Sequence, residues 1–157
     1  MVCHNVTPVY DDDGNKDFQA SSPDEVALVK FVDSLGHQIV DRDENKVVLQ
    51  AVNGTQEEYE ILANFPFSSD TKRMGIVVRH KESGRIIFYL KGAEVVIQDL
   101  VRPTHRGIIM EACENMGMEG LRTLVITQKV LKEEEFKEWQ DEYKKARAAL
   151  NNRNELT

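Results

Sequence analysis

The hydrophobic pattern changes period after Gly36, and this change constrains the fold more than any other feature of the sequence. Between positions 38 and 90, apolar and polar residues alternate with a period of two, which is typical of strands. The connections at 43–45, 53–55 and 82–84 are short and polar, as in hairpins. Strands that follow one another through short turns pair antiparallel. The pattern therefore predicts an antiparallel sheet with strands at Gln38–Asp41, Lys46–Val52, Tyr59–Phe65, Arg73–Arg79 and Arg85–Leu90.

Helical patterns flank this sheet on both sides in the sequence. Before it, Ser22 is a suitable N-cap, Pro23 a suitable first helical residue, and Glu25 can reach back to form a capping box; Gly36 ends this helix. After it, the pattern predicts helices at Gly92–Leu100, Thr104–Met118 and Lys132–Leu150, with a last strand at Leu121–Gln128. We also expect a weak strand at Val2–Tyr10, a loop at 11–16 and frayed residues at 151–157. The fold class is thus α+β, in a single domain covering 1–157.

Composition and missing motifs exclude several functions. The formal net charge of -7 argues against general binding to nucleic acid, which requires basic patches. No apolar run reaches the roughly 18–20 residues of a membrane helix. The histidines and cysteines lack metal-ligand spacing, and the phosphate-binding loop G-x-x-x-x-G-K-[ST] is absent. We therefore predict no catalytic residue and no metal ligand in this chain, and a self-sufficient ATPase or kinase finds no support.

Four segments nevertheless contain residues suited to a nucleotide: Ser22–Glu25, Phe65–Met74, Tyr89–Glu94 and Glu119–Leu124. A nucleotide site without a phosphate-binding loop needs an apolar face for the purine and cations for the phosphates. It also needs a small residue where the ligand approaches the backbone. The residues that can meet these needs are Phe67 for stacking, Lys72 and Lys91 as compact cations, Arg122 as a two-pronged donor, and Gly92 as the small residue.

Each of these residues also has an ordinary structural explanation. Phe67 can belong to the core, and Lys72 with Arg73 can be a solvated pair on a sheet edge. Lys91 and Gly92 can form only a strand-to-helix turn. Arg122 can pair with a surface carboxylate, and the capping box can account for Glu25. Spacing alone leaves these alternatives open.

The last predicted helix has an apolar stripe of Phe136, Trp139, Tyr143, Ala146 and Leu150, close to a heptad repeat. This stripe can serve as a coiled coil that binds a partner, or it can pack on the sheet of the same chain. We favour packing on the sheet, because the stripe is shorter than three heptads.

The four segments, in this order, resemble the nucleotide-binding domain of P-type ATPases over nearly the whole chain. Phe67 to Met74 is similar to the family's Phe-Ser-x-x-x-Lys-Arg-Met signature, Leu90 to Glu94 to Lys-Gly-Ala-[Glu/Asp], and Gly120 to Leu124 to Gly-Leu-Arg-x-Leu. Gln19 to Glu25 resembles the version in phospholipid flippases, as do Cys3-His4-Asn5 and the tail helix. Met74 to Arg79 resembles the endosomal and Golgi branch.

The resemblance implies a role for each site residue. Phe67 would stack on adenine, and Glu25 would lie near its amino edge. Lys72 and Lys91 would line the pocket towards the phosphates, with Gly92 beside them. Arg122 would bind phosphate or ribose oxygens, and Ser69 would be a neighbour of the ligand. Flippases often have a small residue and an arginine where this sequence has Asp70 and Thr71, which lowers the local positive charge.

The resemblance also implies how such a domain works. It would bind ATP and present the γ-phosphate to an aspartate on a separate phosphorylation domain, releasing ADP afterwards and turning over nothing alone. Its partners would be the phosphorylation and actuator domains of one membrane pump on the cytosolic face of a Golgi or endosomal membrane. Mg²⁺ would be needed only in the full-length enzyme, and the isolated domain would be a monomer. The alternatives are the same domain of a cation-transporting pump, or a non-catalytic interaction module that uses the C-terminal helix.

Overall fold

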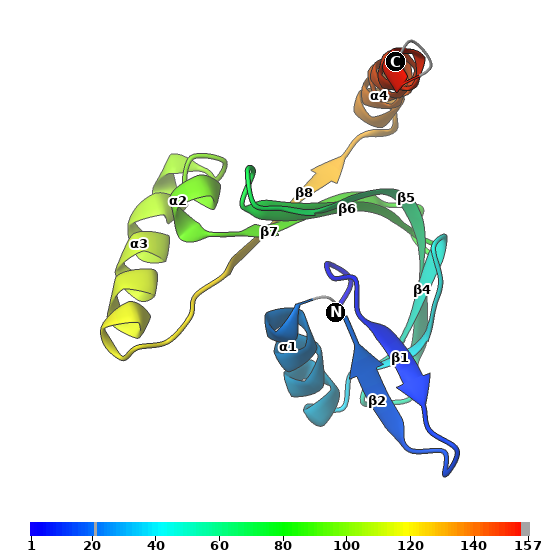
Figure 1. Ribbon diagram of the computed structural model, residues 1–157, viewed down its shortest axis with the longest axis vertical. Helices are drawn as coiled ribbons and strands as arrows, with labels where there is room; N and C mark the ends of the chain where they lie inside the picture. The colour runs from blue at the N-terminus through cyan, green and yellow to red at the C-terminus, as the bar shows by residue number, and fades with distance from the viewer. Residues whose placement is uncertain (21, 155–157) are drawn as a thin grey trace.

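The computed structural model describes residues 1–20 and 22–154, with 147–154 described only as helix backbone. Its centre is a six-stranded antiparallel sheet in which every strand pairs with the next strand in the sequence (Figure 1). The predicted α+β class is therefore confirmed. The strands of this sheet are β3 (Gln38–Arg42), β4 (Lys46–Gln50), β5 (Gln56–Ser68), β6 (Arg73–His80), β7 (Ile86–Gly92) and β8 (Val125–Leu131).

Alternation along the middle strands determines which residues reach each face of the sheet. On β6, Ile76 and Val78 join one buried cluster with Val2 and Ile87, while Val77 joins another on the opposite face. β6 is buried on both faces for most of its length, as expected for a central strand covered from two sides. The polar linkers are the predicted turns, and Gly84 has the positive φ of +66° that such a turn requires.

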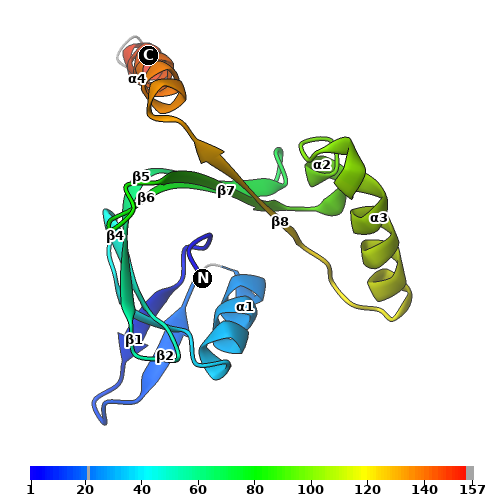
Figure 2. The ribbon, with the colours of Figure 1, turned by 180° about the vertical axis from the view of Figure 1, so that it is seen from behind.

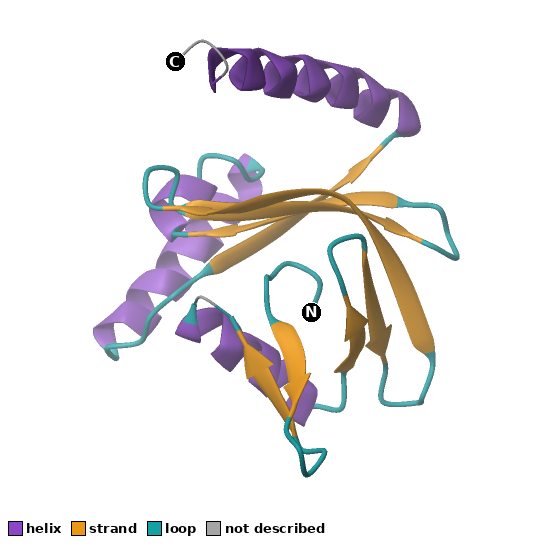
Figure 3. Cartoon of the chain, turned by 45° about the vertical axis from the view of Figure 1, so that its right-hand side comes forward, coloured by secondary structure: helices purple, strands orange, loops and turns teal. Residues whose placement is uncertain are grey.

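The two faces of the sheet carry different elements (Figure 3). On one face lie helix α1 (Pro23–Ser34) and a separate hairpin of β1 (Thr7–Tyr10) and β2 (Lys16–Gln19). Their core contains Val6, Val29 and Ile39, all at most 3% exposed. On the other face lies helix α4 (Glu133–Asn154), whose Phe136 is buried against the sheet.

Helix α4 packs its aromatic residues on the sheet of the same chain, as predicted. The ring centroid of Phe65, on β5, lies 5.9 Å from that of Trp139 and 5.5 Å from that of Tyr143, both edge to face. Ala146 is exposed, and the side chain of Leu150 lies outside the described residues. The helix continues to Asn154, so the predicted end at Leu150 was too early. The remaining predicted frayed residues, 155–157, are not described.

Several boundaries differ from the prediction: β1 begins at Thr7 rather than Val2, and the helix predicted at Gly92–Leu100 is shorter, at Glu94–Ile97 (α2). Lys16–Gln19 forms β2, a strand that was not predicted and that begins at the last residue of the predicted loop 11–16. The Asp11 carboxylate organises the β1–β2 turn by accepting hydrogen bonds from the backbone of Asp13 and Asn15. β5 is longer than predicted, because it continues along β6 as far as Ser68. The last strand begins at Val125 rather than Leu121, since its pairing with β7 starts where Gly92 meets Val125.

The remaining helices, α2 (Glu94–Ile97) and α3 (Pro103–Met118), follow β7 and lie beside the end of the sheet (Figure 2). They connect β7 to β8 and so place the loop before β8 near the end of β7. Among the described residues, no helix combines the length and apolar character needed to cross a membrane.

Candidate functional site

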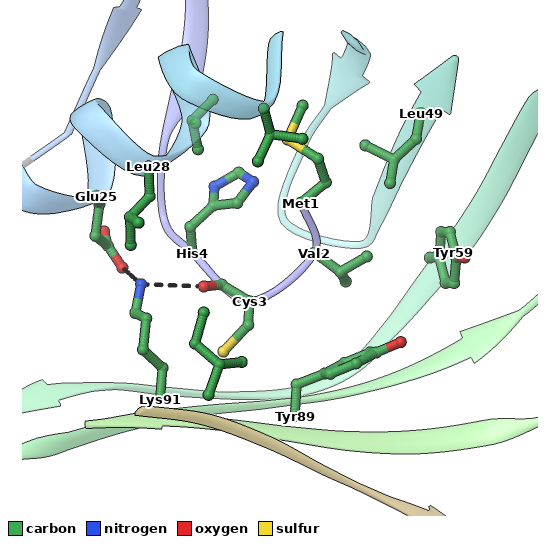
Figure 4. A pocket seen from close by; sticks show the side chains of 13 residues that line it. Met1, Val2, Cys3, His4, Glu25, Leu28, Leu49, Tyr59, Tyr89 and Lys91 are labelled. Carbon is green, nitrogen blue, oxygen red and sulfur yellow. Dashed lines mark hydrogen bonds and ion pairs between the residues drawn. The ribbon is translucent and has the colours of Figure 1, made fainter. Parts of the chain in front are cut away.

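A buried ion pair joins two of the predicted site residues. Lys91, on β7, directs its side chain towards the first turn of α1, where its Nζ lies 2.6 Å from Oε1 of Glu25 (Figure 4). The same Nζ donates to the carbonyl oxygen of Cys3 at 3.0 Å. The side chains of Lys91 and Glu25 are 6% and 10% exposed. Both charges are thus paired and hydrogen-bonded, as burial requires.

The predicted capping box is wrong. Ser22 does occupy the N-cap position and Pro23 the first turn, but no side-chain cap hydrogen bond forms. Glu25 faces inward instead: its Oε2 accepts a hydrogen bond from the backbone nitrogen of Asn5 at 3.3 Å. The partner on β7 outcompetes the local cap, because a buried ammonium without a counter-charge costs far more than an exposed helix end.

The turn between β5 and β6 holds Lys72 against the end of β7. Lys72 donates its backbone N–H to Ser68 at 2.8 Å and accepts one from Ala93 at 3.2 Å. Its φ is +50°, which is the only positive φ of a non-glycine residue among those described. A Cβ at Gly92 would lie 2.7 Å from the Lys72 carbonyl oxygen, so Gly92 makes room for this turn.

Phe67 and Ser69 belong to the same hairpin and are both exposed. Phe67 lies near the end of β5 and is 63% exposed, so it is not a core residue. β6, which follows the turn, is an interior strand between β5 and β7. Lys72 and Arg73 therefore do not lie on a sheet edge. A large aromatic side chain left exposed beside a cationic turn is compatible with stacking on a ligand.

The fourth segment reaches the site through an ion pair. Arg122 lies in the loop before β8, and its Nη2 is 3.0 Å from Oδ2 of Asp24, the neighbour of Glu25 on α1. The side chain of Arg122 is 84% exposed, so this pair contributes little to stability and leaves most guanidinium donors available. The ordinary alternative for Arg122, a surface carboxylate, is therefore present, and it places the side chain beside α1.

A cavity of about 320 Å³ lies on the inner side of the ion pair. Of the predicted site residues only Glu25 and Lys91 line it; Phe67, Ser69, Lys72, Gly92 and Arg122 do not. Its walls are mostly apolar and come from the first residues of the chain, α1 and the sheet. The Glu25–Lys91 pair thus forms part of the wall of this cavity, whereas the β5–β6 turn and Arg122 lie outside its lining.

Sequence reasoning from the residues missed the contribution of the first residues. Cys3 and Asn5 supply backbone partners to Lys91 and Glu25, and their only signal was the resemblance of Cys3-His4-Asn5 to flippase sequences. Burial raises the pKa of the Cys3 thiol to about 11, although the Lys91 charge opposes this shift. Across residues 1–20 and 22–146, no three His, Cys, Asp or Glu side chains gather closely enough to hold a metal ion.

Comparison with known proteins defines the class. The chain belongs to the family described as P-type ATPase, cytoplasmic domain N, whose model matches residues 1–157. It is 41% identical over 172 residues to the probable phospholipid-transporting ATPase IIB of Danio rerio. It is 42% identical over 155 residues to the phospholipid-transporting ATPase NEO1 of Saccharomyces cerevisiae. It is 39% identical over 157 residues to the phospholipid-transporting ATPase IC of Homo sapiens. Each comparison covers 98% of this chain and 15%, 13% and 12% of the respective relative.

These relatives confirm the predicted family and its phospholipid-transporting branch, and they favour it over the cation-pump alternative. The chain spans only about an eighth to a seventh of the length of these relatives.

Proposed function

We propose that this domain binds ATP in a pocket formed by the end of β7, the start of α1 and the β5–β6 turn. The observation that carries the proposal is the Glu25–Lys91 ion pair, which holds a buried ammonium where β7 meets the start of α1. Lys91 has three N–H donors, and two of them go to Glu25 and Cys3. One donor therefore remains for a ligand.

The residues around this pair fit a nucleotide. The exposed ring of Phe67 offers a face for adenine, and the Glu25 carboxylate can accept from its amino group. The ammonium groups of Lys72 and Lys91 and the exposed guanidinium of Arg122 attract phosphate or ribose oxygens. Ser69 is a further neighbour in the turn. Gly92 acts indirectly, because the space beside it is filled by Lys72.

We further propose that the domain acts within a larger pump that couples ATP hydrolysis to phospholipid translocation, as the names of its relatives indicate for those proteins. ATP bound here supplies a γ-phosphoryl group to an aspartate on a separate phosphorylation domain. The residues of this chain bind and orient the nucleotide, and catalysis and Mg²⁺ binding belong to other domains. The actuator domain is a further partner. We propose that this pump lies in a Golgi or endosomal membrane, because Met74–Arg79 resembles the endosomal and Golgi branch of the flippases. We also propose that the isolated domain is a monomer.

Titration of the ¹⁵N-labelled domain with ATP in the absence of Mg²⁺ tests the proposal. We expect saturable changes of amide shifts at Phe67, Lys72, Lys91, Gly92 and Arg122. One stack and a few partly exposed charged contacts predict a Kd from about 1 mM down to tens of micromolar.

A flat titration up to about 5 mM ATP, with a well-dispersed spectrum, would contradict nucleotide binding. Changes confined to α4 would instead favour an interaction module that uses this helix.

A further inference from the structure

We infer that Arg42, together with Asn64, is a positioning residue for the nucleotide site, although neither belongs to the four motifs. They act through residues 3–5, here called the strap. This inference rests on the proposed function, because it concerns the residues that hold Glu25 and Lys91 in place.

The strap completes the ion pair from its backbone. The Cys3 carbonyl accepts from Lys91 Nζ at 3.0 Å, and the Asn5 N–H donates to Glu25 Oε2 at 3.3 Å. Lys91 therefore donates one hydrogen bond to its ion partner and one to the strap, and Glu25 accepts one from each. Any shift of the strap would leave a buried charge with an unmet hydrogen bond, which is costly.

No sheet ladder fixes the strap itself, because it lies outside the regular elements and β1 begins only at Thr7. Side chains from two strands hold it instead. Arg42, at the end of β3, donates from Nη2 to the carbonyl oxygen of His4, in the middle of the strap. Asn64, on β5, donates from Nδ2 to Oδ1 of Asn5 at 3.0 Å.

The His4 ring adds a second anchor for Arg42. His4 Nδ1 accepts the backbone N–H of Val6 at 2.9 Å and lies 3.4 Å from Nη1 of Arg42. Both neighbours are donors, so Nδ1 is the unprotonated nitrogen of a neutral ring. Burial and the Arg42 charge lower the pKa of His4, which keeps the ring neutral. Burial lowers the pKa of Arg42, and the attraction of the Glu25 charge opposes this shift. Arg42 therefore also adds positive charge near the site.

The test compares Arg42→Met with Arg79→Met in the full 157-residue chain. Arg79 is a matched control: its guanidinium is also partly buried, and it pairs with Glu133 on the opposite side of the sheet. In Arg42→Met we expect the Kd for ATP to rise at least fivefold and hydrogen exchange of the Asn5 amide to accelerate at least tenfold. Arg79→Met should change neither. Arg42→Lys keeps a donor and a charge and should restore part of the affinity, which a general loss of packing would not allow.

Exchange of the Asn5 amide requires no nucleotide, so it separates this inference from the proposed function. If the wild-type domain binds no ATP but Arg42→Met still accelerates that exchange, the proposed function is wrong, and the role of Arg42 in holding the strap in place is supported. If Arg42→Met does not fold, Asn64→Leu, at an exposed position, decides the question through the same two measurements. Unchanged Asn5 exchange and unchanged ATP affinity in the folded variant would overturn the inference.

Discussion

The Nζ atom of Lys91 lies 2.6 Å from Oε1 of Glu25, although 66 positions separate the two residues in the sequence. Lys91 lies one residue before the end of β7, the strand that precedes α2, and Glu25 lies in the first turn of α1, the helix that precedes the sheet. This contact therefore brings the start of α1 to the end of β7. It also gives the site a buried ammonium whose counter-charge comes from the protein itself.

Removing one partner of this pair should be worse than removing both. Lys91→Met leaves the Glu25 carboxylate buried without its counter-ion, and we expect a loss of about 3–5 kcal/mol in the free energy of unfolding. Adding Glu25→Leu removes the stranded charge and should recover much of this loss. Urea unfolding of the two single variants and the double variant measures the coupling. Strictly additive losses would contradict an interaction between the two side chains.

Phe67→Ala should weaken ATP binding without weakening the fold. The lost stacking is worth about 1–3 kcal/mol of binding free energy. Because the ring is 63% exposed, the free energy of unfolding should change by less than about 0.5 kcal/mol. Phe31→Ala is a matched control, since Phe31 is 62% exposed on α1. Calorimetric titration and thermal unfolding give the two quantities. Equal ATP affinities in the two variants would rule out stacking on Phe67.

Two substitutions of Lys72 distinguish the role of its ammonium group in ATP binding from the role of its backbone in the turn. Lys72→Ala and Lys72→Gly both remove the ammonium, so they should weaken ATP binding equally. Only glycine relieves the positive φ of +50°, and we expect Lys72→Gly to be more stable than Lys72→Ala by about 1 kcal/mol. Chemical unfolding of the pair measures this difference. A more stable alanine variant would show that the turn does not hold this conformation in solution.

Gly92→Ala should destabilise the domain. The added Cβ would lie 2.7 Å from the Lys72 carbonyl oxygen and 2.9 Å from Cβ of Arg73, so the turn must move. We expect a cost of about 1–3 kcal/mol. Gly117→Ala is the opposite control, because nothing lies within 4 Å of its added Cβ inside α3. That change should stabilise by about 0.5–1 kcal/mol. Thermal unfolding distinguishes the two, and equal effects would contradict the close approach at Gly92.

Acid should destabilise the domain through His4. Burial, followed by the Arg42 charge, lowers the pKa of this ring from 6.5 to about 2. The unfolded chain therefore binds a proton that the folded domain excludes, and stability that is full above pH 6.5 is lost as the pH falls towards 2. At pH 5 the loss is about 2 kcal/mol.

Urea unfolding at pH 7.5 and pH 5 measures this loss. His4→Gln should flatten the pH dependence, whereas His37→Gln, at an exposed position, should not. A wild-type pH dependence that matches His4→Gln would show that His4 does not cause it.

Local pattern was sufficient for most of the sheet, because each strand pairs with its sequence neighbour and the turns carry their own chemistry. It failed where a distant partner decides the outcome. Ser22 and Glu25 fit a capping box as well as any local motif, yet Glu25 turns to Lys91. The strand Lys16–Gln19 was missed because the acidic turn before it reads as loop.

The site was predicted as a set of residues but not as an arrangement. Residue type offered Phe67, Lys91 and Arg122 as candidates, and the resemblance added Glu25 and gave each a role. Spacing alone cannot distinguish an exposed Phe67 from a buried one. Nor does spacing show that Gly92 faces the backbone of Lys72 rather than open space. The contribution of the strap depends on contacts as far as 88 positions apart, which no local pattern encodes.

The consecutive order of the strands also bears on how the site forms during folding. From β3 to β7, pairing of neighbouring strands closes short loops, so this part of the sheet can grow hairpin by hairpin at low entropic cost. Lys91 meets Glu25 and Cys3 only across 66 and 88 positions, and these contacts join the chain's first residues to the finished sheet. We therefore expect the ligand pocket to be among the last parts of the domain to assemble. Nucleotide binding would then indicate a fully folded domain rather than a partly folded one.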